Sequence, residues 1–192
     1  MRPRTALIRL YMTMSLDGYV AGPRDSADDP LGVGGFRLFN WLDDRNSDGP
    51  SGQVYRECLA TGALIAGRRT YEHAGRWNGD HHDDVPMFIL THHADENDVP
   101  PGSARFVTDV AECAAQAKAA AGDRNVLVHG AGAGQSLLQA GLLDELELHV
   151  VPVLLGQGRP LFANLPTTPT ELEQIRQLPA QDVTHLHYRI VK

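Results

Sequence analysis

NVLVHGAGAGQSLLQAGLLDELELHVVPVLLGQGRPLF, residues 125–162, has the clearest structural pattern in the chain. It predicts a buried strand, a glycine turn, a helix, a second strand and a further glycine turn, in that order. The predicted strands are 125–129 and 145–153, and the predicted helix is 135–140. A strand that leads through glycine-rich backbone into a helix N-terminus presents unpaired N–H groups to a phosphate. The stretch therefore suggests a nucleotide cofactor as the first hypothesis.

The same alternation of strands and helices continues on both sides of this stretch. Short apolar runs predict further buried strands at 6–14, 63–66, 85–91 and 105–107. Helical spacing of apolar residues predicts helices at 51–61 and 108–121, and Asp109 with Glu112 forms a capping pattern at the start of the second. Residues 171–178 and 183–191 predict an antiparallel pair. Together they favour an α/β fold, with a mostly parallel sheet covered on both faces and antiparallel strands near the C-terminus.

Length, composition and charge restrict the class of protein. The chain of 192 residues carries 17 Lys and Arg against 24 Asp and Glu, a net charge of −7. That length suits one domain over 1–192, with 22–50 as a long loop inside it and HHDD at 81–84 as a solvated loop. No cluster of basic residues favours nucleic acid, and no apolar run is long enough to cross a membrane. Two isolated cysteines and no signal-peptide pattern predict a cytoplasmic protein with buried thiols.

Polar residues follow two of the predicted strands, where a phosphate could bind. Gly67, Arg68, Arg69 and Thr70 close one strand and open a helical turn, and guanidiniums can fork onto phosphate oxygens. A surface arginine pair is the alternative reading. Thr91 and His92 close the next strand and complete the same pocket if the strands are parallel neighbours. An ordinary polar loop is the alternative there.

The glycine-rich run provides a second place for close backbone approach. Gly130, Ala131, Gly132, Ala133 and Gly134 carry no side chain larger than a methyl group, and Gln135 begins the predicted helix. The even glycine spacing and the lack of an acid at the end of the next strand argue against a Rossmann dinucleotide fingerprint. The run therefore predicts close approach of the backbone to a ligand, beside a helix N-terminus that favours an anion.

Other chemistries find little support in the sequence. The nine histidines show no ligand spacing that is typical of a metal site, so no metal is expected. No nucleophile elbow of the serine hydrolases is present. Val20 and Ala21, which follow Asp17 and Gly18, could form a flat apolar wall for a nicotinamide ring, while Asp17 could equally be a turn former.

Several motifs in this order resemble the dihydrofolate reductase-like superfamily, in particular the reductase domain of the riboflavin biosynthesis protein RibD. The motifs are MSLDGYVAG at 14–22, GRRTYE at 67–72, ILTHH at 89–93, GAGAG at 130–134 and AGLLDELELHVVPVLLGQGRPLF at 140–162. GRRTYE and the last block are specific in combination. The resemblance implies a three-layer α/β/α fold with a mostly parallel eight-stranded sheet, NADPH as cofactor and a homodimer through the sheet edge.

The resemblance also implies roles for individual residues. Thr13, Val20 and Ala21 would lie near the nicotinamide; Arg68, Arg69, Thr70, Thr91 and His92 would hold the adenosine phosphate end; and residues 130–135 would hold the pyrophosphate and ribose. The expected reaction is hydride transfer to a small pyrimidine, pterin or ribosylaminopyrimidine, similar to that of 5-amino-6-(5-phosphoribosylamino)uracil reductase. The arginines favour NADPH over NADH because a 2′-phosphate gives them an anion to pair with.

The substrate end is less defined by the motifs. The segment SGQVY at 51–55 has no acid where dihydrofolate reductases carry a carboxylate, so folate reduction is not expected. Asp17 and His149 are candidate proton donors, although His149 could instead be a strand histidine bonded to backbone. Phe39 and Trp41 could stack on a substrate ring or simply anchor a loop. A non-catalytic NADP-binding or regulatory protein on the same fold is the alternative function.

Overall fold

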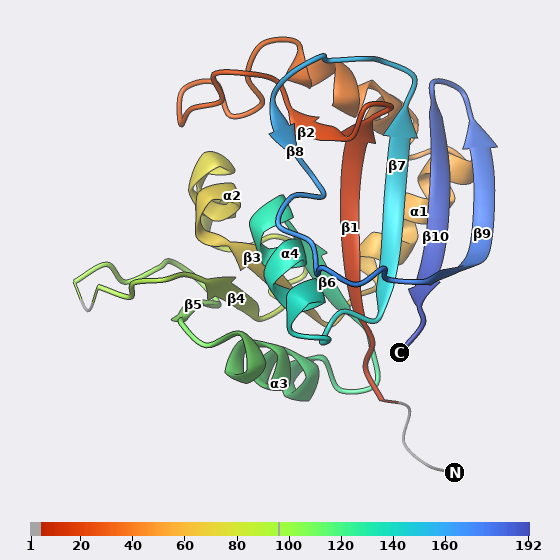
Figure 1. Ribbon diagram of the computed structural model, residues 1–192. Coiled ribbons are helices and arrows are strands. Elements are labelled where there is room, and N and C mark those ends of the chain that lie inside the picture. Colours follow the sequence, from red (N-terminus) through yellow and green to blue (C-terminus); the bar gives the residue numbers. More distant parts are fainter. Residues whose placement is uncertain (1–4, 96) are drawn as a thin grey trace.

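The computed structural model describes residues 5–95 and 97–192, and its centre is a twisted sheet (Figure 1). Within the described residues the strands of this sheet are Ile8–Ser15 (β1), Ala63–Gly67 (β3), Met87–Leu90 (β4), Ala104–Val107 (β5), Val126–His129 (β6), Glu145–Val151 (β7), Leu172–Ala180 (β9) and Val183–Ile190 (β10). Their spatial order is β5-β4-β3-β6-β1-β7-β10-β9. The strands from β5 to β7 are parallel, whereas β10 is antiparallel to β7 and to β9. The predicted α/β sheet with antiparallel C-terminal strands is confirmed.

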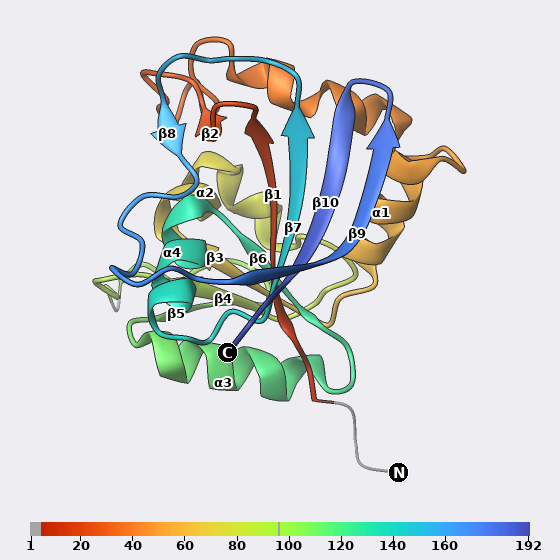
Figure 2. The ribbon, with the colours of Figure 1, turned by 45° about the vertical axis from the view of Figure 1, so that its right-hand side comes forward.

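Helices cover both faces of the sheet, as Figure 2 shows. The helical segments are Gly35–Asp44 (η1, a 3-10 helix), Pro50–Leu59 (α1), Arg68–His73 (α2), Gly75–Gly79 (η2, also 3-10), Val110–Ala121 (α3) and Ala131–Gln139 (α4). One core contains Cys113 of α3 and Leu137 of α4, and the other contains Trp41 of η1, Val54 of α1 and Tyr71 of α2. The fold is therefore a three-layer α/β/α arrangement.

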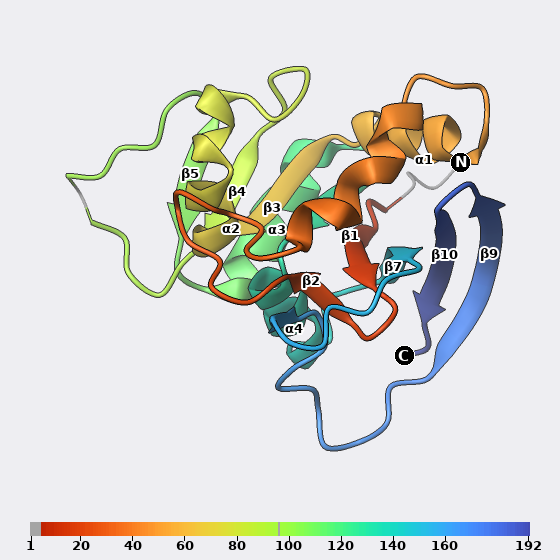
Figure 3. The same cartoon turned by 90° about the horizontal axis from the view of Figure 1, so that it is seen from above.

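The carboxyl end of β1 lies beneath a small second sheet. Tyr19–Ala21 (β2) pairs antiparallel with Arg159–Pro160 (β8). Both β2 and η1 contact β1. Seen from above, β2 lies beside the carboxyl end of β1 (Figure 3). This cover encloses the carboxyl edge of the sheet, which is where open α/β sheets bind their ligands.

Three local predictions need correction. The loop expected at 22–50 contains η1 and the beginning of α1, because apolar side chains such as Leu38 and Trp41 pack into the core at helical spacing. The segment 81–84, expected to be solvated, buries His82, which bonds Thr61 at 3.2 Å. Helix α4 begins at Ala131 rather than at 135, with Gly130 as its N-cap. By contrast, the predicted cap of α3 is confirmed, since Asp109 accepts a hydrogen bond from the Glu112 N–H at 2.7 Å.

Candidate active site

A cavity of about 520 Å³ lies at the carboxyl edge of the sheet, between the ends of β1 and β6 and the helices η1, α1 and α2. The residues predicted from sequence that line it are Thr13, Val20, Ala21, Phe39, Trp41, Arg69, Thr70, Gly130 and Ala131. These residues come from five separate elements, β1, β2, η1, α2 and α4, with Gly130 as the N-cap of α4. The fold thus gathers the predicted nicotinamide wall, the predicted ring-stacking residues and part of the predicted phosphate site around one space.

The apolar half of the cavity is built around Trp41. Its side chain is 3% exposed, and its indole Nε1–H donates a hydrogen bond to Thr13 Oγ1 at 3.1 Å. The ring also packs on His149 and His185, with centroids 4.7 and 5.1 Å away. Trp41 is therefore both an anchor for η1 and part of the cavity wall, so the two alternatives drawn from the sequence are compatible.

The polar half of the cavity lies where α2 and α4 begin. Gly130 has a φ of +97°, and a Cβ at that position would lie 2.3 Å from Thr70 Oγ1. This close approach brings Thr70 beside the first turn of α4, whose N–H groups have no partner within the helix. Hydroxyl, amide and guanidinium donors thus meet at one end of the cavity, an arrangement that suits an anion.

Asp25 places a negative charge at this polar end of the cavity. Its carboxylate accepts hydrogen bonds from Arg69 Nη2 at 2.9 Å and from Arg159 Nε at 3.1 Å. Burial raises the pKa of Asp25, but the hydrogen bonds from the two arginines outweigh it and lower the pKa below its usual value. The cavity therefore already contains one carboxylate beside Arg69, which the sequence could not reveal because the two residues are far apart in the chain.

Asp17 does not fit the role of proton donor. Its carboxylate accepts bonds from Ser15 Oγ at 2.5 Å and from the N–H groups of Leu155 and Gly156 at 3.1 and 2.7 Å. The bond from Ser15 is the largest cause of the lowered pKa of Asp17, and Asp17 is not part of the cavity wall. Asp17 joins the turn after β1 to the loop after β7, so the turn-former reading is the better one.

His149 is also misplaced for direct proton transfer. It is fully buried beneath the cavity, packed between the rings of Tyr11 and Trp41. Its Nδ1 lies 2.9 Å from His185 Nδ1, and burial is the main cause that holds the pKa of His149 well below its usual value. The ring is neutral near pH 7 and supports Trp41 from below. The expected bond to backbone is replaced by the contact with His185.

Part of the glycine-rich run has a packing role rather than a binding role. A Cβ at Gly134 would lie 2.9 Å from Leu10 Cδ1, so this glycine lets α4 approach β1. Ala133 is buried in the same core. Gln135 donates to the Leu161 carbonyl at 2.8 Å and fastens the segment after β8. Gly132 faces open space. Cofactor contacts are therefore retained for Gly130 and Ala131 and withdrawn from Ala133, Gly134 and Gln135.

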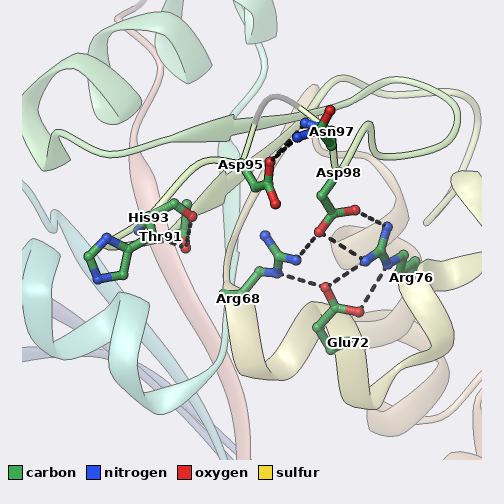
Figure 4. A network of polar contacts seen from close by, with 8 residues as sticks. All are labelled: Arg68, Glu72, Arg76, Thr91, His93, Asp95, Asn97 and Asp98. Atoms are coloured by element: carbon green, nitrogen blue, oxygen red, sulfur yellow. Dashed lines mark hydrogen bonds and ion pairs between the residues drawn. The ribbon is translucent and has the colours of Figure 1, made fainter.

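The remaining predicted residues lie at the same sheet edge but outside the cavity wall (Figure 4). Gly67 caps α2, and Arg68 pairs with Glu72 and Asp98. Thr91 donates to the carbonyl of His93 at 3.0 Å, and His92 is exposed. Because β3 and β4 are parallel neighbours, their ends do lie together as expected, but only α2 turns toward the cavity.

Several cavity residues escaped the sequence analysis. Trp77 belongs to η2, where Arg76, Trp77 and Asn78 all have positive φ values, and it packs near His81, with ring centroids 5.0 Å apart. Burial lowers the pKa of His81 to about 3 and of His129 to about 4. Gly75 and Gly79, the first and last residues of η2, were a signal of unusual backbone, but nothing local showed that the turn would face a cavity.

Two further findings concern the described residues only. They contain no group of three or more His, Cys, Asp or Glu side chains placed to hold a metal ion. They also contain no helix with the length and apolar character needed to span a bilayer.

Cys58 and Cys113 are free and buried, and burial raises the pKa of each thiol to about 12. The expectation of buried thiols is confirmed.

The sequence model of the RibD C-terminal domain matches residues 6–184. The chain belongs to the RibD C-terminal domain family. Over 182 residues it is 28% identical to the uncharacterized protein YwjB of Bacillus subtilis (strain 168), a match that covers 93% of this chain and 95% of YwjB. The resemblance found in the sequence motifs is thereby confirmed.

Solved structures show the same fold. A provisionally assigned riboflavin biosynthesis protein from Shewanella sp. PV-4 has a TM-score of 0.74 at 23% identity and covers 97% of this chain and 99% of its own. Dihydrofolate reductase from Enterococcus faecalis, complexed with NADP(H), has a TM-score of 0.64 at 14% identity, with coverage of 98% and 99%. The deaminase/5-amino-6-(5-phosphoribosylamino)uracil reductase of Thermotoga maritima scores 0.65 at 12% identity, covering 97% of this chain and 57% of that one.

The cavity of this RibD C-terminal domain lacks the carboxylate on α1 that folate reduction would require. Helix α1 contributes Tyr55, Cys58 and Leu59 to the wall, and none of them is an acid. Glu57 points away and forms a two-pronged ion pair with Arg176, at 2.8 and 2.7 Å. The α1 side of the cavity therefore presents phenol, thiol and aliphatic groups and no carboxylate.

Proposed function

We propose that this protein is an NADPH-dependent reductase that transfers a hydride to a small nitrogen heterocycle, a pyrimidine, pterin or ribosylaminopyrimidine. One observation carries the proposal. A single cavity joins the anion-binding end formed by Arg69, Thr70 and the start of α4 to the apolar wall formed by Val20, Ala21 and Trp41. A dinucleotide needs both environments, one for its phosphates and one for the reacting ring.

The size of the cavity limits what can lie inside it. About 520 Å³ is typical of a site that encloses a small ligand. It suits a nicotinamide ring stacked on a heterocycle better than a complete dinucleotide with substrate. We therefore place the reacting rings within the cavity and the adenosine half beyond it, along the start of α2 toward Arg68.

The protein would act mainly by positioning and by exclusion of water. NADPH, when bound, supplies the hydride. Val20 and Ala21 offer a flat surface, and Trp41, fixed by Thr13 below it, gives the opposite apolar wall. Rings held in contact in a dry cavity gain rate from proximity alone. Because His81 and His129 are neutral and Asp25 is ion-paired, water is the proton source in this proposal.

The same electrostatics favours a second candidate function. The cavity groups with depressed pKa values, His81, His129 and Asp25, are all poor proton donors near pH 7. A protein that binds NADPH without turning over a substrate would need no such donor. A non-catalytic NADP-binding or regulatory protein is therefore the alternative, and turnover separates it from the reductase.

Fluorescence titration with NADPH and NADH, followed by NADPH oxidation with candidate heterocycles, tests both candidates. We expect binding of a dinucleotide and multiple turnovers with one heterocycle class. Arg69→Gln should weaken dinucleotide binding by about tenfold, the loss of one hydrogen bond to a charged group. Arg45→Gln is the control, because Arg45 is exposed and bonds only the Leu42 carbonyl. Absence of dinucleotide binding would reject both functions, and binding without oxidation would leave the alternative.

A further inference from the structure

The first arginine of the GRRTYE motif, Arg68, lies in a closed ring of ion pairs at the start of α2 (Figure 4). Arg68 bonds Glu72 Oε1 at 2.7 Å and also bonds the carboxylate of Asp98. Arg76 bonds Asp98 Oδ1 at 2.8 Å and Glu72 Oε2 at 2.9 Å. The two guanidiniums are thus balanced by two carboxylates, and the site has no net positive charge.

The position of Arg68 is fixed from several sides. Its guanidinium carbon lies 4.1 Å from the centre of the Phe106 ring of β5, so the group is stacked on an aromatic face. Glu72 holds its Nε, and Asp98 holds its Nη2. Among the described residues, no hydrogen-bond partner faces Nη1. Arg68 therefore retains donors for a further anion, although one carboxylate already lies against it.

Asp98 itself is held in place by Arg76 more than by Arg68. Hydrogen bonds from Arg76, and then from Arg68, lower the pKa of Asp98, so its carboxylate is charged near neutral pH. Arg76 belongs to η2 and has a φ of +54°, a conformation that a non-glycine residue adopts only when its surroundings support it. The loop after β4, through Asp98, and the turn after α2, through Arg76, therefore support one another.

We propose that Asp98 is a specificity-determining residue, whose carboxylate competes with the 2′-phosphate of NADPH for Arg68 and so narrows the preference for NADPH over NADH. This inference rests on the proposed function. It concerns only the adenosine end, because Arg68 lies outside the cavity that would hold the reacting rings. A 2′-phosphate that approaches Arg68 meets the negative charge of Asp98, whereas the 2′-hydroxyl of NADH carries no charge for Asp98 to repel.

The inference changes the expectation from the motif alone. Two adjacent arginines predict a strong preference for a phosphorylated ribose. In the structure Arg68 is neutralised by Glu72 and Asp98, and Arg69 by Asp25. Of these carboxylates, Asp98 is the one on a loop outside both α2 and the cavity wall. Its charge can therefore be removed with the least effect on the reacting end.

The test compares Asp98→Asn with Asp95→Asn. Asp95 lies in the same loop, and within the described residues its carboxylate bonds only the backbone and side chain of Asn97, so it is the matched control. Dissociation constants are measured for NADPH and NADH by fluorescence titration. Asp98→Asn should tighten NADPH binding by about tenfold, the effect of removing one like charge near a partly exposed anion site, with NADH little changed. Asp95→Asn should leave both constants unchanged.

A second pair of ligands isolates the 2′-phosphate. Adenosine 2′,5′-bisphosphate and adenosine 5′-monophosphate differ only in that group, and the same selective gain is expected for the bisphosphate. Thermal unfolding shows whether each variant is folded. If Asp98→Asn is not, Asp98→Ser removes the same charge with a smaller side chain.

The outcomes separate this inference from the function on which it rests. A selective gain for the 2′-phosphorylated ligands supports the role of Asp98. An equal change for both dinucleotides, or no change, overturns that role while dinucleotide binding by the unmodified protein leaves the reductase proposal standing. If the unmodified protein and every variant bind no dinucleotide, both are overturned.

Discussion

The contact between Gly130 and Thr70 sets the polar end of the cavity at the scale of single residues. Gly130 combines a φ of +97° with a neighbour that leaves no room for a Cβ. Gly130→Ala should therefore destabilise the protein by about 2 kcal/mol or more, from left-handed backbone strain and from displacement of Thr70. Urea unfolding measures the loss. The same variant should bind dinucleotide more weakly, because Thr70 and the start of α4 no longer lie together.

Gly132 gives the matched control in the same helix. A Cβ there meets no neighbour within 4 Å. Gly132→Ala should leave stability unchanged or raise it by up to about 1 kcal/mol, since alanine loses less backbone entropy in a helix. Equal losses in the two variants would mean that helix α4 tolerates no substitution, and the special role of Gly130 would be rejected.

At the scale of elements, Asp25 connects the loop of residues 22–34 to helix α2 and to strand β8. Its pairs with Arg69 of α2 and Arg159 of β8 hold residues 22–34 against the cavity. Asp25→Asn should loosen this loop, which should then show faster amide hydrogen exchange and faster cleavage by protease, with little change in α3 or β5. Asp28→Asn is the control because Asp28 is exposed and its side chain forms no hydrogen bond or ion pair with the described residues. Unchanged exchange in residues 22–34 would show that other contacts hold the loop.

The elements that sequence predicted well are those with strong local signals. The apolar runs of β3, β4 and β6 and the capped helix α3 carry their own periodicity. By contrast, β2 and β8 are so short that only their mutual pairing defines them. Helix α4 was predicted to begin too late because glycine and alanine in its first turn lack an apolar period.

In the candidate site, too, only residues with a local signal in the sequence could be predicted. Arg69, Thr70, Val20 and Ala21 were placed correctly at one cavity because a motif or a strand end marks each of them, whereas Trp41 was a candidate only as an aromatic residue in a long loop. The neutralising carboxylates Asp25 and Asp98 could not be predicted, since they reach the arginines through loops 44 and 30 residues away in sequence. The cofactor roles of the correctly placed residues, and the homodimer implied by the family, stay predictions.

At the scale of the whole molecule, a network of charged side chains joins the parallel and antiparallel parts of the sheet. Glu145 of β7 bonds Arg9 of β1 at 2.9 Å and His187 of β10 at 3.0 Å. Arg176 of β9 bonds Glu57 of α1 and Glu147 of β7. These pairs are largely buried on one face of the sheet, so their protonation should affect global unfolding rather than one loop.

Unfolding should therefore be sensitive to acid. Burial raises the pKa of Glu145, but His187 and Arg9 outweigh it and lower the pKa, while Arg176 lowers the pKa of Glu57. A carboxyl group with a depressed folded pKa stabilises the protein above its unfolded value of about 4.3 and loses that contribution as the pH falls through the folded value. The free energy of unfolding, measured in urea, should fall steeply from about pH 5 downward.

Two variants on one strand test this origin of the acid sensitivity. Glu145→Gln should lower the free energy of unfolding at pH 7 by about 2 kcal/mol, through loss of hydrogen bonds between charged groups, and should flatten the acid dependence. Glu147 lies two positions along β7, but burial raises its pKa, and its Oε2 accepts no hydrogen bond in the described residues although His187 Nδ1 lies 3.2 Å away. Ionised Glu147 therefore lowers the free energy of unfolding above the pKa that the glutamate has in the unfolded chain. Glu147→Gln should leave the free energy of unfolding at pH 7 unchanged or raise it. If the two variants lose the same stability at pH 7, the opposite pKa shifts of the two glutamates are wrong.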